Sequence, residues 1–341
     1  MKVMCRVLAA AIVCSCAVPA FSQNVQLKMA TLAPEGSTWM NAAHQAAEEI
    51  ADRTSGRVTF RFYPGGTMGT DQAVLRKMRI GQLHGGAVLA GSLSVVDPNA
   101  EIYNLPLLFH NYGEVDAVRE QFDRRLIDRI EDQGFVVFGF VETGFVYLMS
   151  SEPNRTFDDL AGRKIWMPEG DTISKAIADA SGLSPVPLSV ADVMTGLQTG
   201  LVDTVAAPPV AAVALQWFTR AKYITDLPVT YVYGAMVASA KAFSKMSPQD
   251  QVVVRDVMGR AMATLDAQAR SDNADAQVAL EKQGVQMVEP TPETRERWYD
   301  MASEATASLI TSQSYDPALI TGIKDALEAY RSEHGEGRSG P

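Results

Sequence analysis

Strand-like and helix-like segments alternate along most of this 341-residue chain. NVQLKMATL has the pattern of a strand and leads into an amphipathic stretch over residues 37–54, after which RVTFRFYPGG alternates apolar residues on one face. The alternation restarts over residues 156–207, beginning with the strand RKIWM. Such units build sheets covered by helices, and the length suits two domains better than one core. We therefore predict a two-domain α/β protein.

Two apolar passages connect the predicted domains. In FVVFGFVETGFVYLMSS, the residues from Glu142 to Gly144 separate two apolar runs, which we interpret as one strand entering a cleft and another leaving it. A second passage over residues 223–239 would carry the chain back. From Pro248 to about Lys282 only Gly259 interrupts a helix-forming composition. A helix of that length, about 50 Å, exceeds one domain, so we expect it to straddle both.

The first residues resemble an export signal. Two basic residues precede an apolar run that is shorter than the roughly 20 residues of a membrane span, and small residues precede Gln23. We therefore expect a signal peptide over residues 1–22 and export to the periplasm. The alternative is a lipoprotein acylated at Cys14 or Cys16, although the residues before each cysteine fit a lipid-attachment site poorly.

Composition excludes several function classes. All three cysteines lie in this leader, so the mature chain has no thiol nucleophile and no cysteine metal ligand. Removing Lys2 and Arg6 takes the formal net charge from −10 to −12, which argues against binding nucleic acid or an anionic membrane. The four histidines have no ligand-like spacing. There is no hydrolase or metal-enzyme motif. We expect no catalytic residues, no metal and no cofactor.

Five segments carry a family resemblance through their order and spacing: PEGSTWMNAAHQAAEEIADRTSGRVTFRFYPGGTMG, LRKMRIGQLHGG, FDDLAGRKIWMPEGD, ADVMTGLQTGLVDTVAAPP and RAKYITDLP. In these the chain resembles the solute-binding (DctP-type) component of tripartite ATP-independent periplasmic (TRAP) transporters over almost all of its mature length. The resemblance implies a two-domain periplasmic solute-binding fold with hinged lobes and a long helix spanning both. It also implies that a solute is delivered to small and large membrane permease subunits.

We expect the lobes to be discontinuous in sequence. Lobe I is predicted over residues 23–143 plus about 233–265, and lobe II over residues 144–232 plus about 266–333, with a flexible tail over residues 334–341.

Two departures from the family pattern bear on the solute. Members that bind organic acids usually carry an arginine after Lys/Arg-Ile, and it clamps the ligand carboxylate; here Trp166 follows Lys164-Ile165. They also commonly carry Glu-Asn-Pro, where this chain has Ala206-Ala207-Pro208. A buried carboxylate without its partner would cost several kcal/mol. We therefore predict an apolar, aromatic or neutral solute that meets few polar groups, rather than a C4-dicarboxylate.

In this hypothesis Trp166 is a wall of the cleft, and the alternative is that it turns inward as core. Carboxylates such as Glu169 and Asp171 cap strand or helix ends, or else face the cleft and hold ligand hydroxyls or a cation. The predicted ligand-binding residues are Trp166, Met167, Glu169, Ala207, Pro208, Trp39, Met68, Glu142 and Tyr231.

Two other functions stay open at this point. One is an organic-acid receptor whose clamping cation has moved to Arg76, Lys77 or Arg79. The other is a periplasmic ligand sensor, which a gene beside a sensor kinase would favour over a gene beside two membrane subunits.

Overall fold

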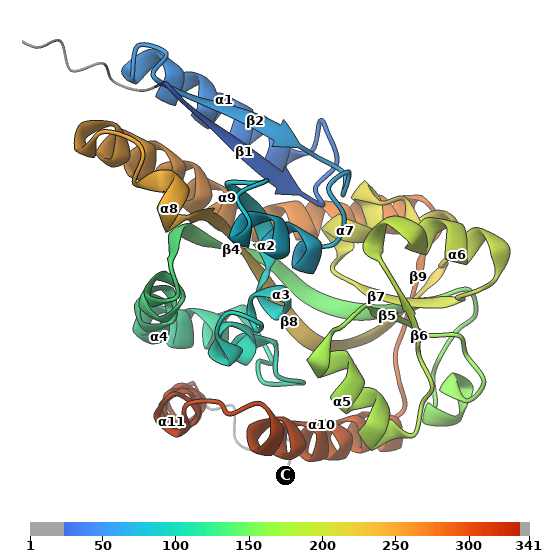
Figure 1. Cartoon of the computed structure of the whole chain (residues 1–341). Coiled ribbons are helices and arrows are strands. Elements are labelled where there is room, and N and C mark those ends of the chain that lie inside the picture. The colour runs from blue at the N-terminus through green and yellow to red at the C-terminus, as the bar shows by residue number, and fades with distance from the viewer. Residues whose placement is uncertain (1–23, 335–341) are drawn as a thin grey trace, which may run out of the picture.

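The computed structural model describes residues 24–334 and contains two α/β lobes that share one mixed sheet (Figure 1). The strands of this sheet lie in the order β2-β1-β3-β8-β4-β7, and β9 pairs with β8. A separate parallel pair is formed by β5 and β6. The predicted α/β class is confirmed. The strands are β1 (Val25–Thr31), β2 (Val58–Tyr63), β3 (Gly85–Leu89), β4 (Phe135–Ser150), β5 (Trp166–Pro168), β6 (Val186–Leu188), β7 (Thr204–Ala207), β8 (Tyr223–Ser239) and β9 (Gln286–Val288).

Side-chain caps fix where the long helices begin. The Ser37 hydroxyl accepts a hydrogen bond from the backbone N–H of Met40 at the start of α1, and Ser247 does the same for Asp250 at the start of α9. The α-helices are α1 (Thr38–Arg53), α2 (Asp71–Arg79), α3 (Ala90–Leu93), α4 (Tyr112–Asp132), α5 (Thr172–Ser181), α6 (Val193–Thr199), α7 (Pro209–Ala214), α8 (Ala240–Phe243), α9 (Pro248–Lys282), α10 (Pro292–Ser312) and α11 (Pro317–Glu333). Short 3₁₀ helices are η1 (Pro98–Asn104), η2 (Phe157–Leu160), η3 (Val190–Asp192) and η4 (Trp217–Thr219).

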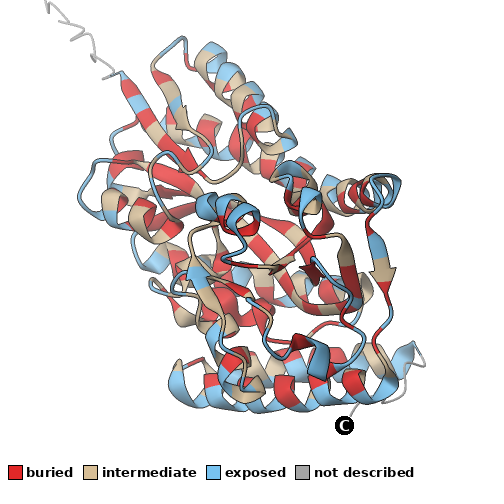
Figure 2. Ribbon diagram, turned by 90° about the vertical axis from the view of Figure 1, so that its right-hand side faces the viewer, coloured by how far each residue is buried: buried red, intermediate tan, exposed pale blue. Residues whose placement is uncertain are grey.

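We call lobe I the part built on β1, β2 and β3 with α1, α2 and α4, and lobe II the part built on β5, β6 and β7 with α5, α6 and α7. The strands β4 and β8 run antiparallel to each other and join the lobes, with pairing from Phe135–Ser239 to Ser150–Tyr223. Figure 2 shows this central region mostly in the colour of buried residues.

The prediction of two separate strands around Glu142-Thr143-Gly144 is wrong, because β4 is continuous and only shifts its register there. Gly144 has φ of 111°, which L side chains rarely adopt, and a side chain here would clash with the Asn273 amide of α9. The Asn273 Nδ2 donates to the carbonyl of Thr143 at 2.9 Å, and its Oδ1 accepts from the N–H of Val210 at 3.2 Å. This bulge therefore lets α9 approach the strand that joins the lobes.

The long helix α9 spans both lobes, as predicted. It begins with Pro248 in the first turn, a position where the missing N–H costs nothing. Its first half is buried with α1 and β1 through residues such as Met258, whereas Leu280 near its end is buried in the core of lobe II. The helix continues through Gly259. A side chain at this position would lie 3.6 Å from the carbonyl oxygen of Phe138 in β4, which is an ordinary contact distance.

The last two helices pack against different lobes. Helix α10 packs against α5 of lobe II, but α11 packs against α4, and its Leu319 and Ile323 are buried in one cluster with Val115 of lobe I. The sequence-based assignment of all residues after about 266 to lobe II is therefore wrong for α11. The other predicted lobe boundaries stay a prediction.

Two predictions fall mainly outside the described part. The signal peptide expected over residues 1–22 lies outside it, as does the tail after His334. Within residues 24–334, each helix is too short or too polar to cross a membrane.

Candidate solute-binding cavity

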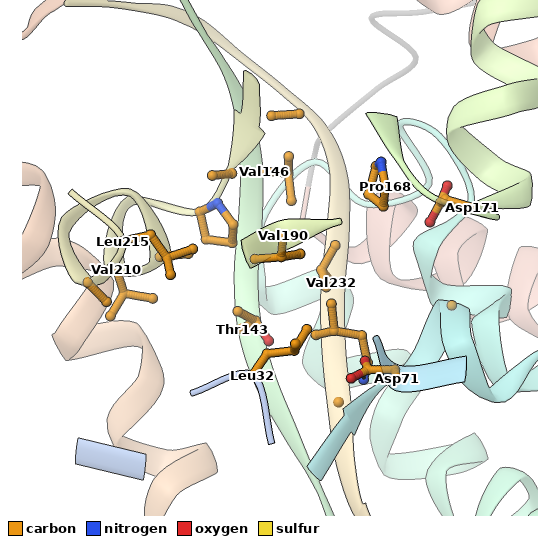
Figure 3. A pocket seen from close by; sticks show the side chains of 18 of the residues that line it. Leu32, Asp71, Thr143, Val146, Pro168, Asp171, Val190, Val210, Leu215 and Val232 are labelled. Atoms are coloured by element: carbon orange, nitrogen blue, oxygen red, sulfur yellow. The ribbon is translucent and has the colours of Figure 1, made fainter. Parts of the chain in front are cut away.

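A large cavity lies between the lobes, with a volume of about 1000 Å³ (Figure 3). Lobe I contributes the loop after β1, the start of α2, and the residues where β3 passes into α3. Lobe II contributes β5, the start of α5, and the segments around α6 and α7. The strands β4 and β8 and one side of α9 form the remaining wall. Strand ends and helix starts thus converge on one space, as is usual for ligand sites in α/β folds.

The lobes also touch across this cavity. The Gln72 side-chain amide of α2 donates to the backbone carbonyl of Glu169 in lobe II at 3.3 Å. Thr172, at the start of α5, donates its hydroxyl to Glu101 of η1 at 2.7 Å. Both contacts link residues of different lobes, so opening the cleft would break them.

The charges on the cavity wall are of one sign. Among the residues that line it in the described part of the chain there is no lysine, arginine or histidine. The alternative cation positions predicted from the sequence, Arg76, Lys77 and Arg79, do not line it either, and Lys77 donates to the carbonyl of Met68 instead. The acidic residues of the wall are Asp71, Glu142, Glu169, Asp171, Asp192, Asp272 and Asp275.

Glu142 is already neutralised by arginines. It is 3 % exposed; its Oε1 accepts from Arg270 Nε at 2.9 Å, and its Oε2 accepts from the Tyr231 hydroxyl at 3.0 Å. Arg119 Nη1 lies 3.8 Å from the same Oε2. Glu142 therefore belongs to an ion-pair network at the junction of the lobes, and its charge is not free for a solute.

Trp166 is mainly a core residue that also borders the cavity. It is 6 % exposed, and its indole N–H donates to the backbone carbonyl of Leu188 at 3.0 Å. Its ring meets that of Trp217 edge-to-face, with centroids 5.1 Å apart. The alternative in which Trp166 turns inward is thus the one the contacts favour, and its N–H is not available to a ligand.

The other predicted site residues divide into two groups. Met68 and Tyr231 do not line the cavity: Met68 packs against the core of lobe I, and Tyr231 is 1 % exposed. Contact of the remaining residues with a solute stays a prediction. The predicted residues that border the cavity are Trp39, Glu142, Trp166, Met167, Glu169, Ala207 and Pro208.

We expect Trp166→Phe to destabilise the solute-free protein by about 1–3 kcal/mol, because it leaves the buried carbonyl of Leu188 without its donor. Urea unfolding measures this, with Trp39→Phe as a control, since Trp39 is only partly buried. If the stability of Trp166→Phe is unchanged and only solute affinity falls, the indole is a cleft wall and not core.

Two buried carboxyls of the cleft region, Asp71 and Glu101, and the half-buried Asp171 have no cationic partner among the described residues. Burial raises the pKa of Asp71 to about 6, although its Oδ2 accepts from the N–H of Leu89 at 2.9 Å. Burial, and the nearby charge of Asp171, raise the pKa of Glu101 to about 7. Burial also raises the pKa of Asp171.

No sequence pattern points to Asp71 or Glu101 as cleft residues. Asp71 follows the cap Thr70 and has the pattern of an ordinary first-turn acid, whereas Glu101 stands in a segment that predicts only a loop. Of the three carboxyls, only Asp171 is predicted from the sequence as a carboxylate that faces the cleft. The prediction that the solute meets few polar groups is not supported, because Asp71, Asn104 and Asp171 line the cavity and Glu101 lies directly behind them.

A model of the bacterial extracellular solute-binding proteins, family 7 (DctP), matches residues 29–313. The chain is 24% identical over 292 residues to a C4-dicarboxylate-binding periplasmic protein, DctP, of Rhodobacter capsulatus, covering 83% of this chain and 86% of that protein. It is 22% identical to the sialic acid-binding periplasmic protein SiaP of Vibrio cholerae over 269 residues, 77% of this chain and 83% of that one.

Solved structures agree in fold. A TRAP periplasmic solute-binding protein from Xanthobacter autotrophicus with bound β-D-galacturonate has a TM-score of 0.81 at 20% identity, covering 89% of this chain and 99% of that chain. One from Ralstonia eutropha with bound (S)-2-acetolactate has a TM-score of 0.82 at 21% identity over the same shares. The bound molecules of these neighbours are acids, which gives no support to the predicted apolar solute.

Proposed function

The chain belongs to the bacterial extracellular solute-binding proteins of family 7, the solute-binding components of TRAP transporters, and we propose that it captures one small solute in the cavity between its lobes. Members of this family are transport proteins and not enzymes. The observation that carries the proposal is the cavity itself, which is large enough for a small organic molecule and is walled by both lobes.

The proposed solute is not held by an arginine clamp. A receptor for sialic acid, galacturonate or a C4-dicarboxylate must compensate a buried carboxylate, at a cost of several kcal/mol if it does not. The described wall of this cavity has acids but no lysine, arginine or histidine. We therefore infer a solute whose polar part does not need a cation and whose remainder lies against the apolar wall, where residues such as Val146, Val190 and Val210 face the space (Figure 3).

Delivery is proposed to follow the family pattern. After removal of the signal peptide the protein would act in the periplasm and pass its solute to a small and a large permease subunit in the membrane. The support for these partners is membership of the family. The hydrogen bonds of Gln72 and Thr172 across the cleft would help to hold the two lobes together during delivery.

The proposal predicts that solute closes the cleft. Small-angle scattering of the protein stripped of solute by partial unfolding and refolding should give a larger radius of gyration than the protein as purified. Adding back the released small-molecule fraction should restore the smaller radius of gyration and raise the melting temperature. At a solute concentration of one hundred times the Kd, the free energy of unfolding should increase by about 2.7 kcal/mol. Stabilisation with an unchanged scattering curve would contradict capture between moving lobes.

A further inference from the structure

The space above Gly91 brings together polar groups from both lobes. A methyl group added to Gly91 would lie 3.3 Å from Asp171 Oδ2, 3.8 Å from Asn104 Nδ2 and 3.9 Å from Glu101 Oε2. Gly91, Asn104 and Asp171 line the cavity, and Glu101 lies directly behind them. One small group placed at this point would therefore meet lobe I and lobe II at once.

One carboxylate oxygen at this point, Glu101 Oε2, has no donor among the described residues. Glu101 is fully buried, and its Oε1 accepts from the Thr172 hydroxyl at 2.7 Å and the Tyr315 hydroxyl at 3.2 Å, but its Oε2 has no hydrogen-bond partner among the described residues. The neighbouring Ser94 hydroxyl donates instead to the carbonyl of Gly91 at 2.6 Å. A buried carboxylate oxygen left without a donor is costly, so this one indicates a missing partner.

Asn104 is a second side chain with an unpartnered acceptor, and it is uncharged. It is 5 % exposed, and its Oδ1 likewise has no partner in the described part of the chain. The two ends of a side-chain amide exchange by a half-turn, which would direct this acceptor into the same space. Asp171 uses Oδ1 to cap α5 through the N–H of Ser174 at 2.6 Å, which leaves Oδ2 toward Gly91.

We propose that this point binds a positively charged nitrogen group of the solute, such as an ammonium or an amidinium. An ammonium offers three donors and no acceptor, and the space above Gly91 offers carboxylate oxygens of Asp171 and Glu101, joined by the Asn104 amide oxygen once that amide has made its half-turn. Asp71 adds a further buried acid to the wall of the same cavity, on the lobe I side (Figure 3). The inference rests on the proposed solute-binding function and names the class of solute.

The proposal is tested with pairs of compounds that share a skeleton and differ in the charge of an end group. The probes are 1,5-diaminopentane against glutarate, and 2-phenylethylamine against 3-phenylpropanoate. Calorimetry and thermal unfolding should show binding of an ammonium compound in either pair and no binding of its carboxylate partner. Carboxylate binding with cleft closure would overturn this inference and leave solute capture intact. Ammonium binding without closure would overturn the proposed capture instead.

Two variants locate the site. Asp171→Asn keeps a good helix cap and should weaken ammonium binding about a hundredfold, because it removes the negative charge that lies nearest to the space above Gly91. Gly91→Ala should weaken it about 10–100-fold by filling the space, at a backbone position that accepts a side chain. Asp316→Asn is the matched control, since Asp316 caps α11 outside the cavity.

Equal affinity of Asp171→Asn, Asp316→Asn and the unchanged protein for the ammonium probe would overturn the proposal. So would a failure of both ammonium compounds to bind at millimolar concentration.

Discussion

Replacing Arg119 with methionine should destabilise the protein by about 3–5 kcal/mol, because it leaves the half-buried Asp123 and Asp266 without their counter-charge and removes one of the two arginines near the buried Glu142. Arg119 of α4 is 11 % exposed and donates two parallel hydrogen bonds of 3.0 Å to Asp266 of α9. Its Nε also donates to Asp123 at 3.0 Å, and it lies 3.8 Å from Glu142 of β4. The side chain therefore ties a helix of lobe I to the long helix and to a strand that joins the lobes.

A matched control lies on the same helix. Arg124 pairs with Asp128 at the same four-residue spacing, at 2.6 Å, but the two side chains are 76% and 50% exposed. Arg124→Met should change the free energy of unfolding by no more than about 0.5 kcal/mol, because exposed ion pairs contribute little. Urea unfolding of both variants measures the difference. Equal, small effects would mean that the network around Glu142 is not a structural element of the junction.

Replacing Glu101 with glutamine should make the solute-free protein more stable by up to about 3 kcal/mol at pH 8. Burial raises the pKa of Glu101 from 4.5 to about 7, so the folded protein binds more protons than the unfolded chain between those values. The contribution of Glu101 to stability is therefore fully present below about pH 4.5 and is lost as the pH rises toward 7. Glutamine removes this penalty and keeps the oxygen that accepts from Thr172 and Tyr315, so the gain should vanish near pH 4.

The control variant for this prediction should change stability in the opposite direction. Glu114 is also fully buried, but Arg331 donates to both of its oxygens, at 2.6 and 2.9 Å. Glu114→Gln should therefore destabilise the protein at pH 8. Thermal unfolding across pH 4 to 8 tests both variants. A Glu101→Gln protein that is less stable than the unchanged one at pH 8 would show that its carboxylate has a favourable partner within the protein.

These opposite effects connect stability with function. A carboxylate that destabilises the empty protein at neutral pH, yet stands beside the cavity, is expected where a ligand supplies the missing charge. Glu101→Gln should thus raise stability and lower affinity for a cationic solute. A purely structural role would not produce both changes together.

The sequence predicted the elements that depend on local pattern. The long helix from Pro248 to about Lys282 follows from its helix-forming composition, and the structure contains it over Pro248–Lys282. The βα order and the family motifs likewise led to the correct fold. These signals are strong because they repeat at helical or strand spacing over many residues.

The predictions that were wrong concern features that depend on contacts between residues far apart in the sequence. The continuity of β4 through Gly144 depends on a bulge beside Asn273, 129 residues later in the chain, and no local pattern reveals it. The partner of α11 is α4 because of burial with Val115, which periodicity alone cannot assign. The motif predicts Trp166 as a wall of the cleft, whereas its contacts with Leu188 and Trp217 set the orientation of the indole.

The binding groups were the least predictable part. Glu101 and Asn104 come from η1 and Asp71 from α2, and they share one region with Asp171 only in the folded protein. Each has an ordinary local context, so composition gave no sign of a cluster of unpaired acids. The sequence shows that Trp166 follows Lys164-Ile165, but it does not reveal the acids that line the cavity.

Mass spectrometry of the solute released from protein purified under mild conditions tests the central claim most directly. The account predicts one solute per chain that carries a positively charged nitrogen group and is lost from Asp171→Asn but not from Asp316→Asn. A released organic acid without such a group, for example a hexuronate or a C4-dicarboxylate, would contradict it.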